Sequence, residues 1–399
     1  MNLKVAIAGG GIGGFAAALA LSRGGQQVEL FEKAAAFTEI GAGIQLGPNV
    51  TRLLNDWGLT TAIRQLASVP ERLQVRSATT GSVLGELRLG DAIAARYGAP
   101  YLTLHRADLH AVLQQAVEQT SAVVQTHSDV QGFQQTPRSV AFHTKLQTKT
   151  DMREVDILVG ADGLWSSIRQ QLLGDGPARR TGHLAYRALI RQADLPERLR
   201  SQNVTAWFGP SMHAVQYPVR SGEWLNVVVF VHGDVPDDFQ NWDHRVNKAG
   251  LAASLMATLQ ASCLALQEVI HAAPDWRLWV MHERLPMLGA HQHAQGRVAL
   301  LGDAAHPMRP YLAQGAGMAI EDAAELGSVM HGVTQQNVPS ALQKYADNRW
   351  RRNARVQARA LSNGQIFHAT GLLRLGRDAA MRLMGERLLD MPWLYGFKR

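Results

Sequence analysis

The sequence predicts an α/β fold: a discontinuous Rossmann-like dinucleotide-binding domain, an inserted mainly antiparallel β-sheet domain and a C-terminal helical segment. Three observations predict it. Residues 5–32 are typical of strand, glycine-rich turn, helix and strand. A second buried strand, RVALLGD, lies at 297–303, and alternating apolar segments occupy residues 180–232 between the two. Since both nucleotide-type units belong to one sheet, we expect the alternating segments to be an insertion that faces the substrate.

The first element carries glycines at the spacing of a dinucleotide-binding turn. Gly9, Gly11 and Gly14 form a GxGxxG motif, and Glu32 follows at the end of the second strand. The glycines permit a tight turn, close approach of the pyrophosphate and helix packing. The helix N-terminus attracts phosphate, and Glu32 accepts hydrogen bonds from ribose hydroxyls. The motif leaves open whether the dinucleotide is NAD or FAD. The expected cofactor contacts in this unit are Gly9, Gly11, Gly13, Gly14, Glu32 and Lys33.

The rest of the chain divides by its apolar patterns. A helix is expected at 104–119, short strands near 122–146, an apolar strand at 155–160, a helical stretch at 245–272 and helices over most of the last 60 residues. The expected division is a dinucleotide-binding domain in three parts (1–75, 101–175 and 276–335), substrate-domain strands at 76–100, a substrate domain at 176–275 and a C-terminal helical segment at 336–399.

Composition indicates a globular protein of two or three domains. The 399 residues are 46% hydrophobic and 18% charged, and Cys263 is the single cysteine, so no intrachain disulfide can form. A strand follows Met1 directly, which leaves no room for a signal peptide, and no apolar run reaches transmembrane length. We therefore expect a cytoplasmic protein.

The net charge of +7 is concentrated at the C-terminal end, where residues 344–399 hold twelve Lys and Arg but four Asp and Glu. Arg352, Arg355 and Arg359 fall on one face of an expected helix. Such a face is usually solvated, and the alternative is a surface for lipid or an acidic partner. Nothing in the chain resembles a nucleic-acid-binding module, so no nucleic-acid partner is expected.

Two glycine–acid pairs follow apolar runs, Asp162-Gly163 and Gly302-Asp303. The second stands at the carboxyl end of a buried strand, where α/β sheets bind ligands. An acid there can hold a polyol chain, which FAD has in its ribityl group and NAD lacks. Downstream, Gly315-Ala316-Gly317 opens a helix whose N–H groups can stabilise negative charge on a reduced flavin. Arg106, at the start of a helix, is placed to reach the FAD pyrophosphate.

The GxGxxG motif, DGLWSSIR at 162–169 and GDAAHPMRPYLAQGAGMAIEDA from residue 302 resemble, in this order, the single-component FAD-dependent aromatic hydroxylases. The resemblance covers essentially the whole chain. It implies bound FAD, NADH or NADPH as reductant and O2 as co-substrate, and a flavin C4a-hydroperoxide that attacks the ring. It also implies that Asp162 contacts both dinucleotides, that Asp303 binds the ribityl chain and that Pro307 lies over the flavin. Finally, it suggests a homodimer, with the basic C-terminal helices at its interface or on lipid.

Within the substrate domain, residues 209–218 resemble the 3-hydroxybenzoate 6-hydroxylases, in which a histidine and a tyrosine here face the aromatic acid. His213 and Tyr217 are four residues apart and share a strand face. We expect one of the two to help deprotonate the substrate hydroxyl, because a phenolate attacks electrophilic oxygen better than a phenol, and Tyr217 to bind the carboxylate. The alternative is that both simply fill the covered face.

Two departures keep the substrate open. The 6-hydroxynicotinate 3-monooxygenases, also similar, have a histidine where this chain has Gln45, which we place among the cofactor contacts. The hydroxybenzoate type has a glutamine at Pro310, and Tyr311 is an alternative side chain for that place. Salicylate 1-hydroxylase chemistry remains an alternative.

The predicted function is hydroxylation of a single-ring hydroxylated aromatic or pyridine carboxylic acid. The compact insert at 175–275 disfavours a larger ring. Two different classes of protein stay open beside this enzyme: a non-catalytic FAD-binding protein and a plain NAD dehydrogenase.

Overall fold

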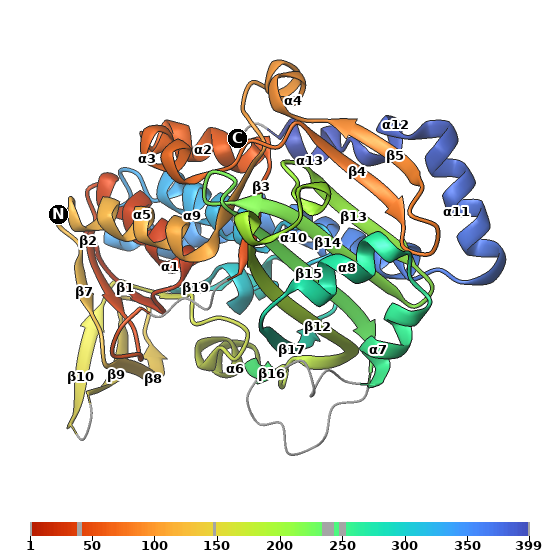
Figure 1. The fold of residues 1–399 in the computed structure, drawn as a ribbon. Helices are drawn as coiled ribbons and strands as arrows, with labels where there is room; N and C mark the ends of the chain where they lie inside the picture. Colours follow the sequence, from red (N-terminus) through yellow and green to blue (C-terminus); the bar gives the residue numbers. More distant parts are fainter. Residues whose placement is uncertain (1, 38–41, 147–148, 234–242, 247–252, 398–399) are drawn as a thin grey trace.

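A computed structural model describes residues 2–37, 42–146, 149–233, 243–246 and 253–397 of the chain (Figure 1). The glycine at 41 and residues 247–252 of the expected helical stretch lie outside these ranges. A parallel sheet covered by helices stands beside a larger sheet, and the C-terminal helices run along the latter (Figure 1). This architecture confirms the predicted fold class.

The dinucleotide-type sheet has six strands in the order β18-β19-β11-β1-β2-β7. The pairs from β19 to β7 are all parallel, and β18 is antiparallel to β19. Three helices, α1 (Ile12–Arg23), α5 (Arg106–Glu118) and α9 (Gly315–Val329), pack with it around one apolar core. The strands are β1 (Lys4–Ala8), β2 (Gln27–Phe31), β7 (Val123–Gln125), β11 (Ile157–Gly160), β18 (Ala294–Gln295) and β19 (Val298–Leu300).

The inserted sheet has eight strands in the order β16-β17-β12-β15-β14-β13-β4-β5, antiparallel except for the pair β13 and β4. Side chains alternate across it, so Tyr186 packs in the core beneath α7 (Ala253–Gln260) and α8 (Leu264–Ala272), whereas Arg187 faces a cavity. The strands are β4 (Arg72–Ser77), β5 (Val83–Arg88), β12 (Arg179–Arg191), β13 (Val204–Gly209), β14 (Met212–Val219), β15 (Trp224–His232), β16 (Asp243–Val246) and β17 (Trp276–Glu283).

Three details differ from the expected segments. Strand β4 begins before residue 76, and β17 lies beyond residue 275, yet both pair within the eight-stranded sheet. The start of the expected helical stretch is strand β16. Local apolar patterns do not show that β17 belongs to the same sheet as β12. This membership follows from the pairing of the two strands, which are distant in the sequence.

Two small sheets and four short helices also lie in the described part of the chain. A three-stranded antiparallel sheet and a two-stranded sheet pair strands from this half of the chain. These strands are β8 (Ser128–Gln135), β9 (Val140–Leu146), β10 (Lys149–Val155), β3 (Gly43–Leu46) and β6 (Leu102–His105), and the short helices are α2 (Pro48–Asp56), α3 (Thr60–Leu66), α4 (Gly90–Tyr97) and α6 (Ser167–Leu173).

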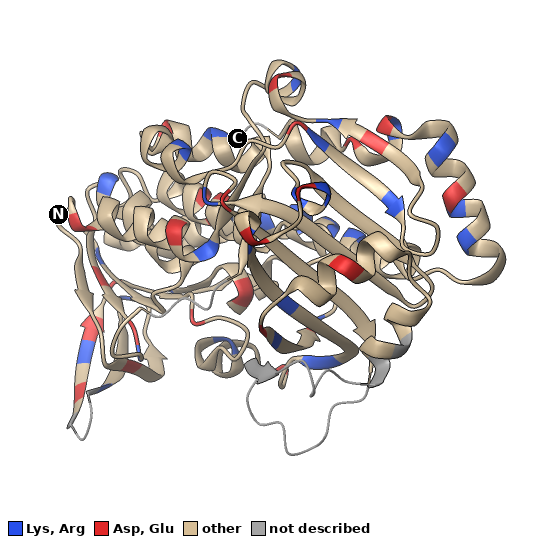
Figure 2. Cartoon of the chain, viewed as in Figure 1, with Lys and Arg blue, Asp and Glu red and all other residues tan. Residues whose placement is uncertain are grey.

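The basic C-terminal segment folds as α10 (Val338–Phe367), α11 (Gly371–Met384), α12 (Glu386–Leu389) and α13 (Pro392–Tyr395). Figure 2 shows acidic and basic positions together on α11. A solvated face is the wrong description of Arg352: it makes two bonds to Glu321 at 2.6 and 2.7 Å and stacks on Phe397. Among the described helices, none combines the length and the apolar character needed to cross a membrane.

Beside Arg352 lies a fully buried network around Asp322. Its carboxylate accepts bonds from Arg349 and Asn353 and contacts His306 at 2.5 Å. Burial opposes ionisation of Asp322, but His306 and Arg349 hold its pKa below the usual value. Burial also lowers the pKa of His293 to about 3, and its ring bonds to the Leu300 carbonyl and to Asn353 as a neutral group.

We expect the protein to lose stability as the pH falls from about 6.5. Between that pH and about 3, His293 is protonated in the unfolded chain and neutral in the folded one, so acid favours unfolding. This group alone costs about 2 kcal/mol at pH 5. Thermal unfolding between pH 7 and 5 measures how steeply the stability falls with pH, and this fall should be smaller in His293→Gln. An equal fall in stability in the variant would contradict this assignment.

Candidate active site

The N-terminal turn forms a cradle for a phosphate group. Gly9 has a φ of +104°, and a Cβ there would lie 2.4 Å from the Ala161 carbonyl oxygen. A Cβ on Gly14 would lie 1.9 Å from the Gly9 carbonyl oxygen, so both positions require glycine for packing. At Gly11 a Cβ would meet nothing within 4 Å. The packing therefore leaves the second glycine facing open space at the start of α1.

A small cavity adjoins this turn at the end of β2. It has a volume of about 160 Å³ and includes Gly11, Glu32 and His110 in its lining. The Glu32 carboxylate accepts hydrogen bonds from the backbone N–H groups of Gly10 and Ala34, both at 2.8 Å. These bonds hold the acid at the edge of the cavity. Lys33 is exposed and does not line it.

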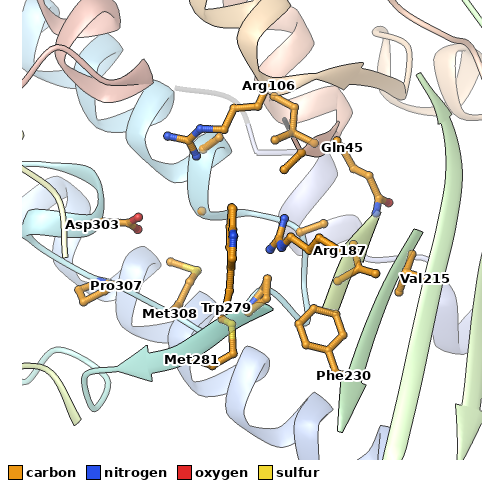
Figure 3. Close-up of a pocket in the computed structure, with 18 of the residues that line it drawn as sticks. Gln45, Arg106, Arg187, Val215, Phe230, Trp279, Met281, Asp303, Pro307 and Met308 are labelled. Carbon is orange, nitrogen blue, oxygen red and sulfur yellow. The ribbon is translucent and has the colours of Figure 1, made fainter. Parts of the chain in front are cut away.

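A larger cavity of about 510 Å³ lies between the two sheets (Figure 3). Its first wall comes from the dinucleotide side. Arg106 enters from the start of α5, Asp303 follows β19, and Gly315 and Ala316 form the N-terminus of α9. The residues of this wall that the sequence singled out are Gln45, Arg106, Asp303, Pro307, Gly315 and Ala316. Gly302 and Gly317 are buried beside it.

The second wall is the inward face of the eight-stranded sheet. Arg187 projects from β12 with its guanidinium 3.9 Å from the Trp279 ring centroid (Figure 3). The other side chains on this wall are Val215, Tyr217, Val228, Phe230, Trp279, Met281 and His282. Our sequence reasoning missed Arg187, although a charged residue inside the apolar run YRALI could have drawn attention to it.

Tyr217 is buried at the end of this wall near Gln45. Burial raises its pKa to about 12, while Arg187 and a hydrogen bond with Gln45 act in the opposite direction. Gln45 also accepts a hydrogen bond from the Tyr101 hydroxyl at 2.6 Å. Tyr217 is therefore a neutral hydroxyl at neutral pH, which can donate a hydrogen bond but cannot act as a resting base.

His213 shares the strand face of Tyr217 but is not among the residues that line the cavity, so its expected contact with the aromatic acid stays a prediction. Phe230 stands opposite it on β15 and stacks on its ring, with centroids 4.4 Å apart. Nδ1 of His213 contacts Nε2 of His368 at 2.6 Å. Tyr311 is also outside the lining, and its hydroxyl bonds to Nδ1 of His183.

Asp162 and Gly163 occupy the turn between β11 and α6. Gly163 has a φ of +78°, and Oδ2 of Asp162 accepts a bond from the Ile168 N–H at 3.3 Å. Oδ1 is buried and has no hydrogen-bond partner among the described residues. Burial raises the pKa of this carboxyl, while bonds from Ser166 and from backbone groups oppose the shift. Neither described cavity includes the pair, so their contact with the dinucleotides stays a prediction.

The residues present fit FAD. Gly11 leaves room for a pyrophosphate, and Glu32 lies at the end of β2, where a ribose would be bound. Asp303 and the α9 N-terminus share the larger cavity, so one side of it offers an acid for the ribityl chain and N–H groups for the flavin ring. The other side, lined by Arg187 and aromatic side chains, remains for a substrate.

Comparisons with known proteins agree with this geometry. The sequence profile of a family described as FAD binding domain matches residues 2–360. The chain is 37% identical to 3-hydroxybenzoate 6-hydroxylase from Polaromonas naphthalenivorans, over 99% of this chain and 96% of that protein. It is 34% identical to 6-hydroxynicotinate 3-monooxygenase from Bordetella bronchiseptica, over 89% of each. Its fold is similar to a salicylate hydroxylase substrate complex, with a TM-score of 0.82, 24% identity and coverage of 100% of this chain and 96% of that one.

Proposed function

This chain belongs to the FAD binding domain family and is a flavoprotein aromatic monooxygenase, and from that premise we propose that it hydroxylates a single-ring hydroxylated aromatic carboxylic acid. Among such acids we favour 3-hydroxybenzoate, because the relative at 37% identity is named for it. Salicylate and 6-hydroxynicotinate are the alternatives. Enzymes of this class consume NAD(P)H and O2.

The observation that carries the proposal is the position of Arg187. Its cation lies on the cavity wall opposite Asp303 and the N-terminus of α9, and it is stacked on Trp279 rather than extended into solvent. Arginine binds carboxylates through two parallel hydrogen bonds. An aromatic acid with its carboxylate at Arg187 would place its ring among the apolar side chains of the sheet.

The chain's own residues have three tasks in this reaction. Arg187 and Tyr217 bind and orient the acid, since one offers a charge and the other a neutral hydroxyl. Val215, Phe230 and Met281 exclude water from the ring. Gln45, Asp303 and the α9 N-terminus hold the cofactor, and FAD when bound supplies the chemistry that activates O2.

Tyr217→Phe should lower kcat/KM for the acid by about tenfold, because one hydrogen bond to a charged substrate is lost. The pKa of about 12 predicts no contribution of this hydroxyl to the pH profile below about pH 10. Steady-state kinetics from pH 6 to 10 test both statements. Val215→Ala, on the same strand face, is the matched control for loss of packing. If Tyr217→Phe kept full turnover, the assigned role would be wrong.

Substrate-stimulated oxidation of NADH and NADPH tests the proposed function. The holoenzyme is assayed with 3-hydroxybenzoate, salicylate, 4-hydroxybenzoate and 6-hydroxynicotinate. Strong stimulation by one acid, with a matching hydroxylated product, supports the proposal. Absence of stimulation by every acid points to a larger ring or to a non-catalytic FAD-binding protein. The same assay decides between NADH and NADPH.

We further propose a homodimer that forms through α11. Leu372, Leu373 and Leu383 are 85%, 79% and 86% exposed on this helix, which is more apolar surface than a lone helix face usually leaves to water. Light scattering over a wide concentration range should give a dimer, and Leu373→Glu should shift it to monomer. A monomer at all concentrations would contradict this, and binding of the wild type to anionic vesicles would favour lipid contact.

A cytoplasmic location is proposed from the single cysteine and the need for NAD(P)H.

A further inference from the structure

Three histidines gather outside the described cavity, where the C-terminal segment meets the eight-stranded sheet. His183 on β12 and His232 on β15 are directly paired across the two strands. His368 follows the last residue of α10. One nitrogen of each ring lies within 4.8 Å of one nitrogen of the other two. His183 and His368 are buried, and His232 is exposed, so the group opens to solvent on one side.

The spacing of the rings is close to that of metal ligands. Four-coordinate zinc with bonds of about 2.0–2.1 Å to imidazole requires nitrogens about 3.3 Å apart. Nδ1 of His368 and Nε2 of His232 are 3.0 Å apart. The centroids of the His183 and His232 rings are 4.1 Å apart, and each lies 5.0 Å from that of His368. Small side-chain rotations would therefore bring three nitrogens around one ion.

The hydrogen bonds around the group fix which ring nitrogens carry lone pairs. Arg309 can only donate, so Nε2 of His183, 3.3 Å from its Nη1, carries the lone pair and Nδ1–H donates to the Tyr311 hydroxyl. An ion bound at Nε2 of His183 would take the place of this Arg309 contact. A cation on Nδ1 of His368 leaves the proton on Nε2, which then donates to Nδ1 of His213. Two of the three rings thus have an outer partner that fixes their orientation, as metal-binding histidines usually have.

Charge does not exclude a cation here. Besides burial, Arg309 next to the rings lowers the pKa of all three, but its two bonds to Glu283, at 2.5 and 2.9 Å, offset part of its charge. Burial lowers the pKa of His183 to about 4 and that of His368 to about 3, with neighbouring histidines and Arg309 adding to the effect, so placing positive charge on these rings is unfavourable. Imidazole binds metals in its neutral form.

We propose that His183, His232 and His368 form a binding site for a divalent transition-metal ion of the Zn²⁺ class, with water in the fourth position. Neutral imidazoles suit zinc, cobalt, nickel and copper. The ion would join the end of α10 to strands β12 and β15. It would thereby fasten the C-terminal helices to the substrate sheet. Binding of FAD and of the substrate would not need this ion.

A second cluster, His293, His306 and Asp322, differs in a way that strengthens the choice. It is fully buried, and Asp322 is already bonded to Arg349, whose cation takes the place that a metal would need. In the first group Arg309 also bonds one member, at Nε2 of His183, but at 3.3 Å and while it is held by Glu283, and this group is reached from solvent through His232.

Cobalt binding to the FAD-loaded, untagged protein tests the site. After dialysis against EDTA, we expect one equivalent of Co²⁺ to bind, with the visible absorption of a four-coordinate ion at wavelengths beyond those of the flavin. Zn²⁺ should displace it and raise the Tm. His232→Gln, an exposed change that should not disturb folding, and His368→Gln should each weaken binding more than about 100-fold, since outer partners alone account for 10–100-fold.

His331→Gln is the matched control, because His331 is exposed and lies outside the group. It should leave the Co²⁺ titration unchanged. Absence of saturable binding near one equivalent would overturn the proposal. So would binding that His232→Gln leaves intact, or a loss that His331→Gln reproduces.

Discussion

Gly11→Val should give a folded protein that no longer retains FAD. A Cβ at Gly11 meets nothing within 4 Å, and the residue has a φ of −78°, so valine there neither clashes with the protein nor strains the backbone. The added side chain instead fills the space in which a pyrophosphate meets the start of α1. We expect FAD affinity to fall by at least about 100-fold, or about 2.8 kcal/mol, with the far-UV spectrum and Tm of the FAD-free protein unchanged.

Flavin absorbance after gel filtration measures the retained FAD. Gly376→Val is the matched control, because Gly376 on α11 also faces open space but lies far along the chain from the cofactor residues. It should keep its FAD. Full flavin content in Gly11→Val would show that the turn does not hold the pyrophosphate.

Arg187→Met should raise the KM for the aromatic acid about 100-fold and leave binding of FAD unaffected. Methionine preserves the packing on Trp279 but removes the charge that we pair with the carboxylate. Truncating one partner of a desolvated charge pair costs roughly 2–5 kcal/mol, and 100-fold lies within that range.

The matched control is Arg191→Met, which removes an exposed arginine from the end of the same strand. Its KM should be that of the wild type. For a phenol without a carboxylate, the KM should be the same with the wild type and with Arg187→Met. If Arg187→Met raised the KM for the acid and the KM for the neutral phenol by the same factor, Arg187 would act through packing and not through its charge.

Local sequence patterns predicted where the expected cofactor-side residues lie along the strands and helices. GxGxxG, Gly302-Asp303 and Gly315-Ala316 each sit where a strand ends or a helix begins, so their geometry follows from short-range rules. The parallel strands and the inserted antiparallel sheet were also predicted from the period of their apolar residues.

The substrate side depended on pairing between distant strands. The alternation of β14 placed His213 and Tyr217 on one face, but it could not show that Phe230, opposite His213 on β15, stacks on that ring. Likewise, Arg352 looked solvated because its partner Glu321 lies on another helix, 31 residues earlier. Charged and aromatic contacts of this kind appear only when the elements are assembled.

The most direct test of the central claim is the product formed under ¹⁸O2 with NADH or NADPH and the acid that stimulates oxidation most strongly. We predict a product that carries one labelled oxygen from O2, with its carboxylate retained if the reaction is of the 3-hydroxybenzoate type. Replacement of the carboxyl group by labelled hydroxyl would instead indicate the salicylate type within the same class. Unlabelled acid recovered with hydrogen peroxide as the sole product, for every acid tested, would contradict hydroxylation of these acids.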